Sequence, residues 1–159
     1  MACFSPKPLY QTQEPTLASA ALVQANRFAQ QGRYDQALRL IEGEAEDSPT
    51  SLMVRMVCEW KGLKDLDRAL ASYELLRACN EAPPPLLAAA ARNADSIRLE
   101  RKVHAIREAQ SAGKDARTKQ EHISSAYGFE EIDLEEPCTS DLRFHALYGA
   151  GLHWYKGED

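Results

Sequence analysis

The feature that most constrains the fold of this chain is a ten-residue stretch that occurs twice in related form. The copies are GRYDQALRLI at residues 32–41 and KDLDRALASY at residues 64–73, and aligning Ala37 with Ala69 sets a period of 32 residues. The same period also pairs Ala25 with Val57, Phe28 with Trp60, Tyr34 with Leu66, Asp35 with Asp67 and Ile41 with Tyr73. A repeat of this length, with apolar positions in the same order, predicts two copies of one structural unit.

Apolar residues three and four positions apart predict four helices in the first half of the chain. We expect them between Thr16 and Gly32, and at residues 34–46, 51–61 and 66–79. Thr16 is suited to the N-cap of the first helix and Gly32 to its end. Pro49 is expected to close the first pair of helices, and the prolines at 83–85 are expected to close the second.

An alanine-rich stretch after these prolines predicts one long helix of about 26 residues that ends before Gly113. Its apolar stripe consists of Leu87, Ala91, Ala94, Ile97, Val103 and Ile106. We expect this helix to cap the preceding pairs, with a break near Asp95 and Ser96 as the alternative. Pro6, Pro8 and Pro15 predict an extended arm over residues 1–15. The predicted organisation is therefore an arm, a helical domain at 16–112 and a different segment at 113–159.

Charge and cysteine content exclude several classes of protein. The net charge is -5, and all of the excess acidity lies in residues 113–159. Nucleic-acid binding needs a basic stripe, which the sequence lacks, so no nucleic-acid partner is expected. No apolar run reaches the length of a membrane span and no secretory leader is recognisable, so no membrane partner is expected either. The four cysteines, at positions 3, 58, 79 and 138, lack the spacing of a disulfide framework, which favours a reducing, cytoplasmic setting.

The repeated unit resembles the tetratricopeptide repeat, a pair of helices with small residues at the tight helix crossing. The match in the first unit consists of Ala25, Phe28, Gly32, Tyr34, Ala37, Ile41 and Pro49. The second unit keeps Val57, Trp60, Leu66, Ala69 and Tyr73, replaces the turn glycine with Lys64, and has its proline displaced to Pro83. The resemblance covers residues 16–83 and implies an all-α fold: two repeats, a long capping helix and a less regular C-terminal segment. A generic helical bundle with an accidental repeat is the alternative.

The resemblance implies an adaptor or chaperone that holds a peptide or helix of another protein in a helical groove. The groove is expected to be lined by polar residues from the first helix of each unit, namely Asn26, Arg27, Gln30, Arg55, Glu59 and Lys61. Because incomplete repeat stacks leave an apolar end uncovered, a homodimer is also plausible.

The acidic stretch YGFEEIDLEEPCTSD, at residues 127–141, alternates apolar and acidic residues and fits a short strand or a flexible linear motif. Glu130, Glu131 and Asp133 are candidate partner-binding residues there, because clustered carboxylates attract a cationic partner. An alternative function follows: a repeat scaffold that carries a C-terminal module, either an acidic inhibitor-like motif or a small metal-dependent enzyme.

The last eighteen residues carry a large apolar content, and because of Gly149 and Gly151 the sequence does not assign them to a single helix. We expect these aromatic residues to cover the repeat stack, with a surface patch for another protein as the alternative.

Catalytic chemistry is not expected. The best metal-like set is Cys138, His145 and His153, whose spacing does not place three ligands on one helical face. Asp141 and His145 form a carboxylate–histidine pair that fits a helix surface as well as a site. No serine elbow, phosphate-binding glycine loop or HExxH motif is present, so neither an enzyme activity nor a metal or other cofactor is predicted.

Overall fold

The computed structural model describes residues 20–43, 48–132, 134–135 and 137–158, and helices are the only regular secondary structure within them. The all-α prediction is therefore confirmed. The elements are α1 (Ala20–Gln30), α2 (Tyr34–Glu42), α3 (Pro49–Cys58), the π-helical turn η1 (Glu59–Leu63), α4 (Leu66–Ala78), α5 (Pro84–Asp115), α6 (Lys119–Glu130) and α7 (Ser140–Glu158). The arm predicted for residues 1–15 and the N-cap predicted at Thr16 lie outside the described residues.

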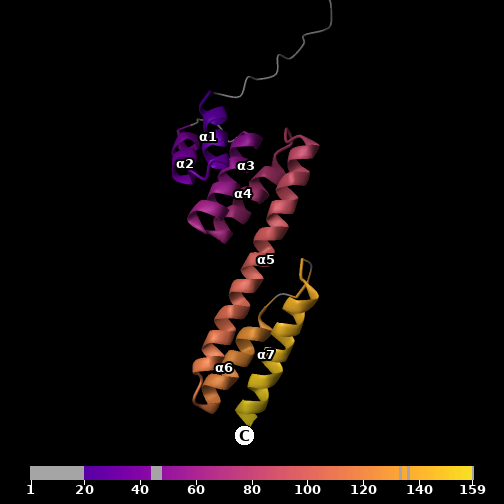
Figure 1. Ribbon diagram of the computed structural model, residues 1–159. Helices are drawn as coiled ribbons and strands as arrows, with labels where there is room; N and C mark the ends of the chain where they lie inside the picture. Colours follow the sequence, from indigo (N-terminus) through magenta and orange to yellow (C-terminus); the bar gives the residue numbers. More distant parts are fainter. Residues whose placement is uncertain (1–19, 44–47, 133, 136, 159) are drawn as a thin grey trace, which may run out of the picture.

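The first four helices form an N-terminal lobe together with the first half of α5 (Figure 1). α1 packs on α2, and α3 packs on α4. Ala37 lies in the core between α1, α2 and α3, Ala69 lies in the core between α3, α4 and α5, and both are fully buried. Tight packing at these two alanines agrees with the sequence pattern, while membership of the tetratricopeptide family stays a prediction.

Two predicted boundaries in this lobe are wrong for the same reason. α2 ends at Glu42 with Gly43 as its C-cap, and Pro49 begins α3 instead of closing the unit before it. Ser48 caps α3 by accepting a hydrogen bond from the Ser51 N–H at 3.2 Å. A proline in the first turn of a helix loses no hydrogen bond, so the same residue that stops one helix can start the next.

Helix α3 continues without a break into η1, where the turn widens. Lys64 ends η1 in the left-handed conformation with a φ of 58°, and Asp65 then caps α4 by accepting the Arg68 N–H at 3.0 Å. A Cβ on Gly62 would lie 2.4 Å from Tyr34 Cβ, so η1 approaches α2 too closely for any side chain at this position.

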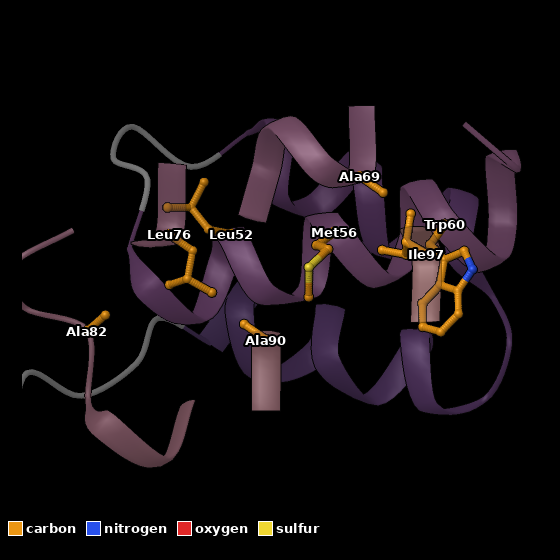
Figure 2. Close-up of a cluster of buried hydrophobic side chains, with 8 residues drawn as sticks. All are labelled: Leu52, Met56, Trp60, Ala69, Leu76, Ala82, Ala90 and Ile97. Atoms are coloured by element: carbon orange, nitrogen blue, oxygen red, sulfur yellow. The ribbon is translucent and has the colours of Figure 1, made fainter. Parts of the chain in front are cut away.

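Helix α5 is the spine of the molecule. It has 32 residues, which corresponds to roughly 48 Å of helix, and it runs unbroken past the predicted break at Asp95 and Ser96 and past Gly113. Its first half closes the N-terminal core, shown in Figure 2, to which α5 contributes Ala90 and Ile97. Its second half belongs to another core.

That other core defines a C-terminal lobe, made by the second half of α5 with α6 and α7 (Figure 1). Its buried apolar residues are Ile106, Ala109, Phe129, Ile132, Ala146 and Ala150. The C-terminal segment, expected to be less regular, is largely helical, and α6 begins where Thr118 and Glu121 form a reciprocal capping box. None of the helices in the described ranges is both long and apolar enough to cross a membrane.

Candidate functional site

Most of the large apolar side chains of helix α7 lie on its solvent-exposed face and not on the face that packs against α5 and α6. The face toward α5 and α6 buries small residues, namely Ala146, Gly149, Ala150 and Gly157, and the imidazole of His153. The outer face carries Phe144, Leu147, Tyr148, Leu152 and Tyr155, which are between 36% and 67% exposed. We call these five residues the α7 stripe. A helix of a folded domain normally points its large apolar residues inward, so this arrangement is inverted.

The close approach of α6 explains the inversion. A Cβ on Gly149 would lie 2.5 Å from Phe129 Cζ, and a Cβ on Gly157 would lie 2.8 Å from Ile123 Cγ1. The space between the helices is filled from the α6 side, mainly by the buried ring of Phe129. There is no room for a side chain at Gly149 or Gly157, and most of the large apolar residues of α7 lie outside. The half-buried Leu142, near the start of the helix, is an exception.

The single helix that the sequence left unassigned here is present, since α7 runs through both Gly149 and Gly151. The two glycines have different environments. Gly149 meets Phe129, whereas a Cβ on Gly151 would have no atom within 4 Å. Gly151 lies among the residues of the α7 stripe, on the open face. The expectation that these aromatic residues cover the repeat stack is also wrong, because α7 packs on α5 and α6 and not on α1–α4.

A groove of about 310 Å³ runs beside the α7 stripe, between α5 and α7. Its lining includes Tyr148 and Leu152 of the stripe together with Lys114, His145 and Lys156. None of the residues that line this groove is acidic, within the part of the chain that the structure describes. The apolar stripe therefore has a cationic border on its α5 side.

Two histidines lie beneath the stripe, at the contact of α6 with α7. The Nδ1 atoms of His122 and His153 are 3.1 Å apart, and the His153 ring also stacks on Phe129. Burial, followed by the neighbouring His122 and Lys156, lowers the pKa of His153 below its ordinary value. Burial therefore favours the neutral ring of His153, whose Nδ1 lies within hydrogen-bond distance of His122.

A larger groove, of about 680 Å³, lies between the two lobes. Its cations are already engaged: Arg98 pairs with Asp95 at 3.1 Å, Arg101 pairs with Asp67 at 3.3 Å, and Lys102 donates to the Glu135 carbonyl. The contact of Arg101 holds α4 against α5, and that of Lys102 holds the segment after α6 against α5. The groove has no charge left over that points to an anionic ligand.

The residues predicted to line a groove on the repeats lie on three elements, α1, α3 and η1. Asn26, Arg27 and Gln30 are exposed on α1, and Arg55 is half-buried on α3. Lys61 is exposed in η1, with its Nζ 3.3 Å from the centre of the Trp60 ring. Neither of the two grooves described above is lined by any of these residues.

Glu59 is a correction to that set. Its side chain is buried, accepts a hydrogen bond from Ser72 Oγ at 2.6 Å and pairs with Arg68 at 3.4 Å. The physical reason is that η1 lies between α2 and α4, so its first residue has neighbours on both sides. Glu59 is therefore part of the packing of the N-terminal lobe and is not available to a partner.

The acidic stretch divides between packing and surface. Phe129 and Ile132 are buried in the C-terminal core, and the described residues of the stretch form no strand. Glu130 accepts a hydrogen bond from Trp154 Nε1 at 2.6 Å, and the exposed Glu131 lines the groove between the lobes. Asp133 lies outside the described residues.

The histidines and cysteine considered as metal ligands are not brought together. Within the described ranges, no group of three or more His, Cys, Asp and Glu side chains is placed to hold a metal ion. His145 is exposed beside Phe144, while His153 is buried against His122.

The chain matches no protein-family model, no curated protein and no solved structure. The functional argument therefore depends on the geometry of the molecule itself.

Sequence reasoning gave a surface patch for another protein only as the alternative for the last eighteen residues, although the spacing of the α7 stripe was visible. Phe144, Tyr148, Gly151 and Tyr155 follow one another at intervals of four, three and four residues, which is the spacing of one helical face. Ala146, Gly149 and Ala150 lie on the other face, and a face of small residues indicates close helix contact. The pattern could have been found by treating the small residues as the buried ones.

Proposed function

We propose that this protein is a non-enzymatic adaptor that binds another protein through the α7 stripe. The inverted helix is the observation that carries the proposal. An aromatic side chain has about 150–250 Å² of surface, so the exposed fractions of these five residues correspond to roughly 500–600 Å² of contiguous apolar area. That is the upper end of what a monomer exposes, and large patches of this kind mark interaction sites.

Aromatic residues support a protein partner in particular. Tyr and Phe are enriched at the centres of protein interfaces, where a few large side chains supply most of the binding energy. Phe144 and Tyr148 already stack on one another, with ring centres 5.7 Å apart, so part of the surface is ordered before a partner arrives. Such preorganisation reduces the entropy lost on binding.

In this proposal the N-terminal lobe is the scaffold, and its likeness to two tetratricopeptide repeats remains a hypothesis. The adaptor or chaperone role and the cytoplasmic setting inferred from the sequence are kept, but the binding surface moves from the repeats to α7. The alternative of a scaffold with a C-terminal module also changes, since the module is the apolar face of α7 and not the acidic stretch.

The proposal is tested by photo-crosslinking in the cells that make the protein. A crosslinking amino acid is placed at Leu147 in the stripe and, as the matched control, at Leu75, an exposed leucine on α4. We expect a defined protein adduct from position 147, its loss in the Phe144→Ser/Tyr148→Ser variant, and no such adduct from position 75. Equal labelling at both positions, or none at either, would contradict the proposal.

The groove expected on the repeats is tested in the same assay. Alanine at both Asn26 and Arg55 should leave the adduct at position 147 unchanged. If these substitutions abolish it while the protein stays folded, the partner-binding surface lies on the N-terminal lobe and our assignment to α7 is wrong.

A further inference from the structure

We infer that the occupant of the α7 stripe is an amphipathic helix of a partner protein whose apolar face is flanked by acidic residues. The inference rests on the proposed function and specifies the chemistry of the partner. It is carried by three features: the spacing of the stripe, the opening at Gly151, and the charge of the groove beside it.

The spacing of the stripe fits a helical partner. Intervals of four, three and four residues between Phe144, Tyr148, Gly151 and Tyr155 are those of a heptad seam, in which a residue of one helix inserts between residues of another. Over these positions the seam is roughly 16 Å long, which is three turns of helix. A partner helix lying along α7 would meet a contact on every turn.

Gly151 supplies the opening into which a partner residue can insert. It lies between Tyr148 and Tyr155 along the seam, and a Cβ there would have no atom within 4 Å. A glycine inside a helix costs about 0.5–1 kcal/mol relative to alanine. Unlike Gly149 and Gly157, which make room for Phe129 and Ile123, Gly151 has no packing against the described residues that requires a glycine. A close approach from outside gives it a role.

The sign of the charge beside the stripe selects an acidic partner. Lys114 of α5 and Lys156 of α7 line the groove on the α5 side of the stripe, and the described residues that line it include no acidic one. Carboxylates on a partner helix, one turn to the side of its apolar face, would lie against these cations. Complementary charges of this kind accelerate association and fix orientation.

A second copy of this chain is a poorer occupant. A symmetric dimer uses the same patch on both copies, so each copy would bring a border with Lys114 and Lys156 and no complementary acidic border from the groove lining. The area is also small, because roughly 500–600 Å² on each side falls below the 2,000 Å² or more in total that is typical of obligate homodimers.

A membrane surface is a poorer occupant as well. Stable attachment to anionic lipids typically takes a cluster of about 4–8 Lys and Arg residues. The stripe and its groove offer Lys114, Lys156 and the exposed Arg143. Glu130 is held at the α6 side by its hydrogen bond with Trp154, which adds a negative charge to the same lobe.

The test uses the full chain and two synthetic helical peptides of about three heptads that share one apolar face. One peptide carries Glu at the flanking positions and the other carries Lys. We expect the Glu peptide to bind at least tenfold more tightly, with a difference that shrinks as salt is added because exposed charges are screened. Fluorescence anisotropy gives both affinities.

Variants of the protein locate the interaction. Lys114→Glu/Lys156→Glu should reverse the preference between the peptides, while the control Arg39→Glu/Arg92→Glu, with the same charge change on the N-terminal lobe, should leave it intact. Gly151→Leu should abolish binding without unfolding the protein, since the position is open. Circular dichroism checks that every variant stays folded.

The possible outcomes separate this inference from the proposed function. If both peptides bind equally and Leu147→Glu removes both, the stripe is a docking surface and the acidic partner is wrong. If neither peptide binds, the inference is overturned, and crosslinking at position 147 then decides the proposed function independently. Binding to phosphatidylserine vesicles that depends on Leu147, or dimerisation that depends on Leu147, would replace the helix with a membrane or a second copy.

Discussion

Two glycines of α7, only two positions apart, show how one residue type serves opposite purposes. Gly149 allows α6 to approach, because the ring of Phe129 occupies the space where its side chain would be. Gly151 makes no such contact and lies on the open face. The difference between them is decided by the neighbouring helix and not by the local sequence.

Alanine substitutions at these glycines should therefore have opposite effects on stability. Gly149→Ala forces a methyl group to within 2.5 Å of Phe129 and should lower the free energy of unfolding by about 1–3 kcal/mol through overpacking. Gly151→Ala should raise it by about 0.5–1 kcal/mol, because alanine loses less backbone freedom on folding. Urea denaturation of the two variants measures both. Equal effects at the two positions would mean that α7 does not pack with the face described.

Protonation of His153 should weaken the C-terminal lobe. Its pKa in the folded state lies below the ordinary value of 6.5, so below about pH 6.5 the unfolded chain binds more protons than the folded one. The free energy of unfolding should therefore fall as the pH is lowered through this range, and be unaffected by this group at higher pH. The groups that face the His153 ring are His122 on α6, Lys156 on α7 and Lys114 across the groove. None of them is acidic, so none would stabilise a positive charge on His153.

The pH dependence is measured by urea denaturation of the full chain at a series of pH values between about 5 and 8. His153→Asn should flatten the dependence, whatever it does to stability at neutral pH. His145→Asn, which changes an exposed histidine of the same helix, should leave the slope as it is. An unchanged slope in His153→Asn would show that the buried pair does not titrate in this range.

Helices in this chain are defined as much by their neighbours as by their own patterns. η1 lies between α2 and α4, so Cys58, Glu59 and Trp60 are all buried in succession. A helix with one buried face would bury about one residue in three or four there. This is why the sequence pattern placed Glu59 on the surface when the fold places it inside.

The helices of the N-terminal lobe should fold without those of the C-terminal lobe. The buried residues of the N-terminal cores all lie at or before Ile97, so a chain without residues 116–159 keeps them. It loses the partners of Ile106 and Ala109 and the Glu135 carbonyl that accepts from Lys102. We expect the truncated chain to remain helical and to unfold cooperatively, as measured by circular dichroism in urea. A truncated chain without a cooperative transition would instead support the idea, drawn from the sequence, that the C-terminal segment caps the N-terminal helices.

At the scale of the whole molecule, α5 is shared by two cores that otherwise make few contacts (Figure 1). The ion pair of Arg101, in the second half of α5, with Asp67 of α4 is one contact between the lobes. Exposed ion pairs contribute little to stability, typically about 0–1 kcal/mol each. The lobes should therefore respond separately to damage in one core.

Phe129→Ala tests this independence. Removing a buried ring costs about 3–5 kcal/mol, and the loss should fall on the C-terminal core. Hydrogen exchange followed by mass spectrometry should show faster exchange in α6, α7 and the end of α5, with α1–α4 unchanged. Ile97→Ala, in the other core, should show the reverse pattern. Faster exchange throughout the chain in either variant would indicate one cooperative unit.

The sequence was sufficient for the helices that bury large apolar residues at regular spacing. Ala37, Ile41, Ala69 and Leu76 all lie in the N-terminal cores as their periodicity predicted, and the boundaries of α4 were within one residue. The long helix was also predicted, although too short, because Gly113 was taken as its end. Alanine-rich helices continue through a single glycine when tertiary packing stabilises the turn, as α6 does here.

The sequence by itself determined the helical class and the core of the N-terminal lobe, since both follow from local propensity and from the period of the apolar residues. Only the tertiary structure decided that α7 is one helix with its large residues outside, and that Glu59 is inside. Both depend on which neighbouring helix fills the shared space. Phe129, twenty residues from Gly149, fills the space beside it in the C-terminal lobe. The stripe of α7 therefore faces outward.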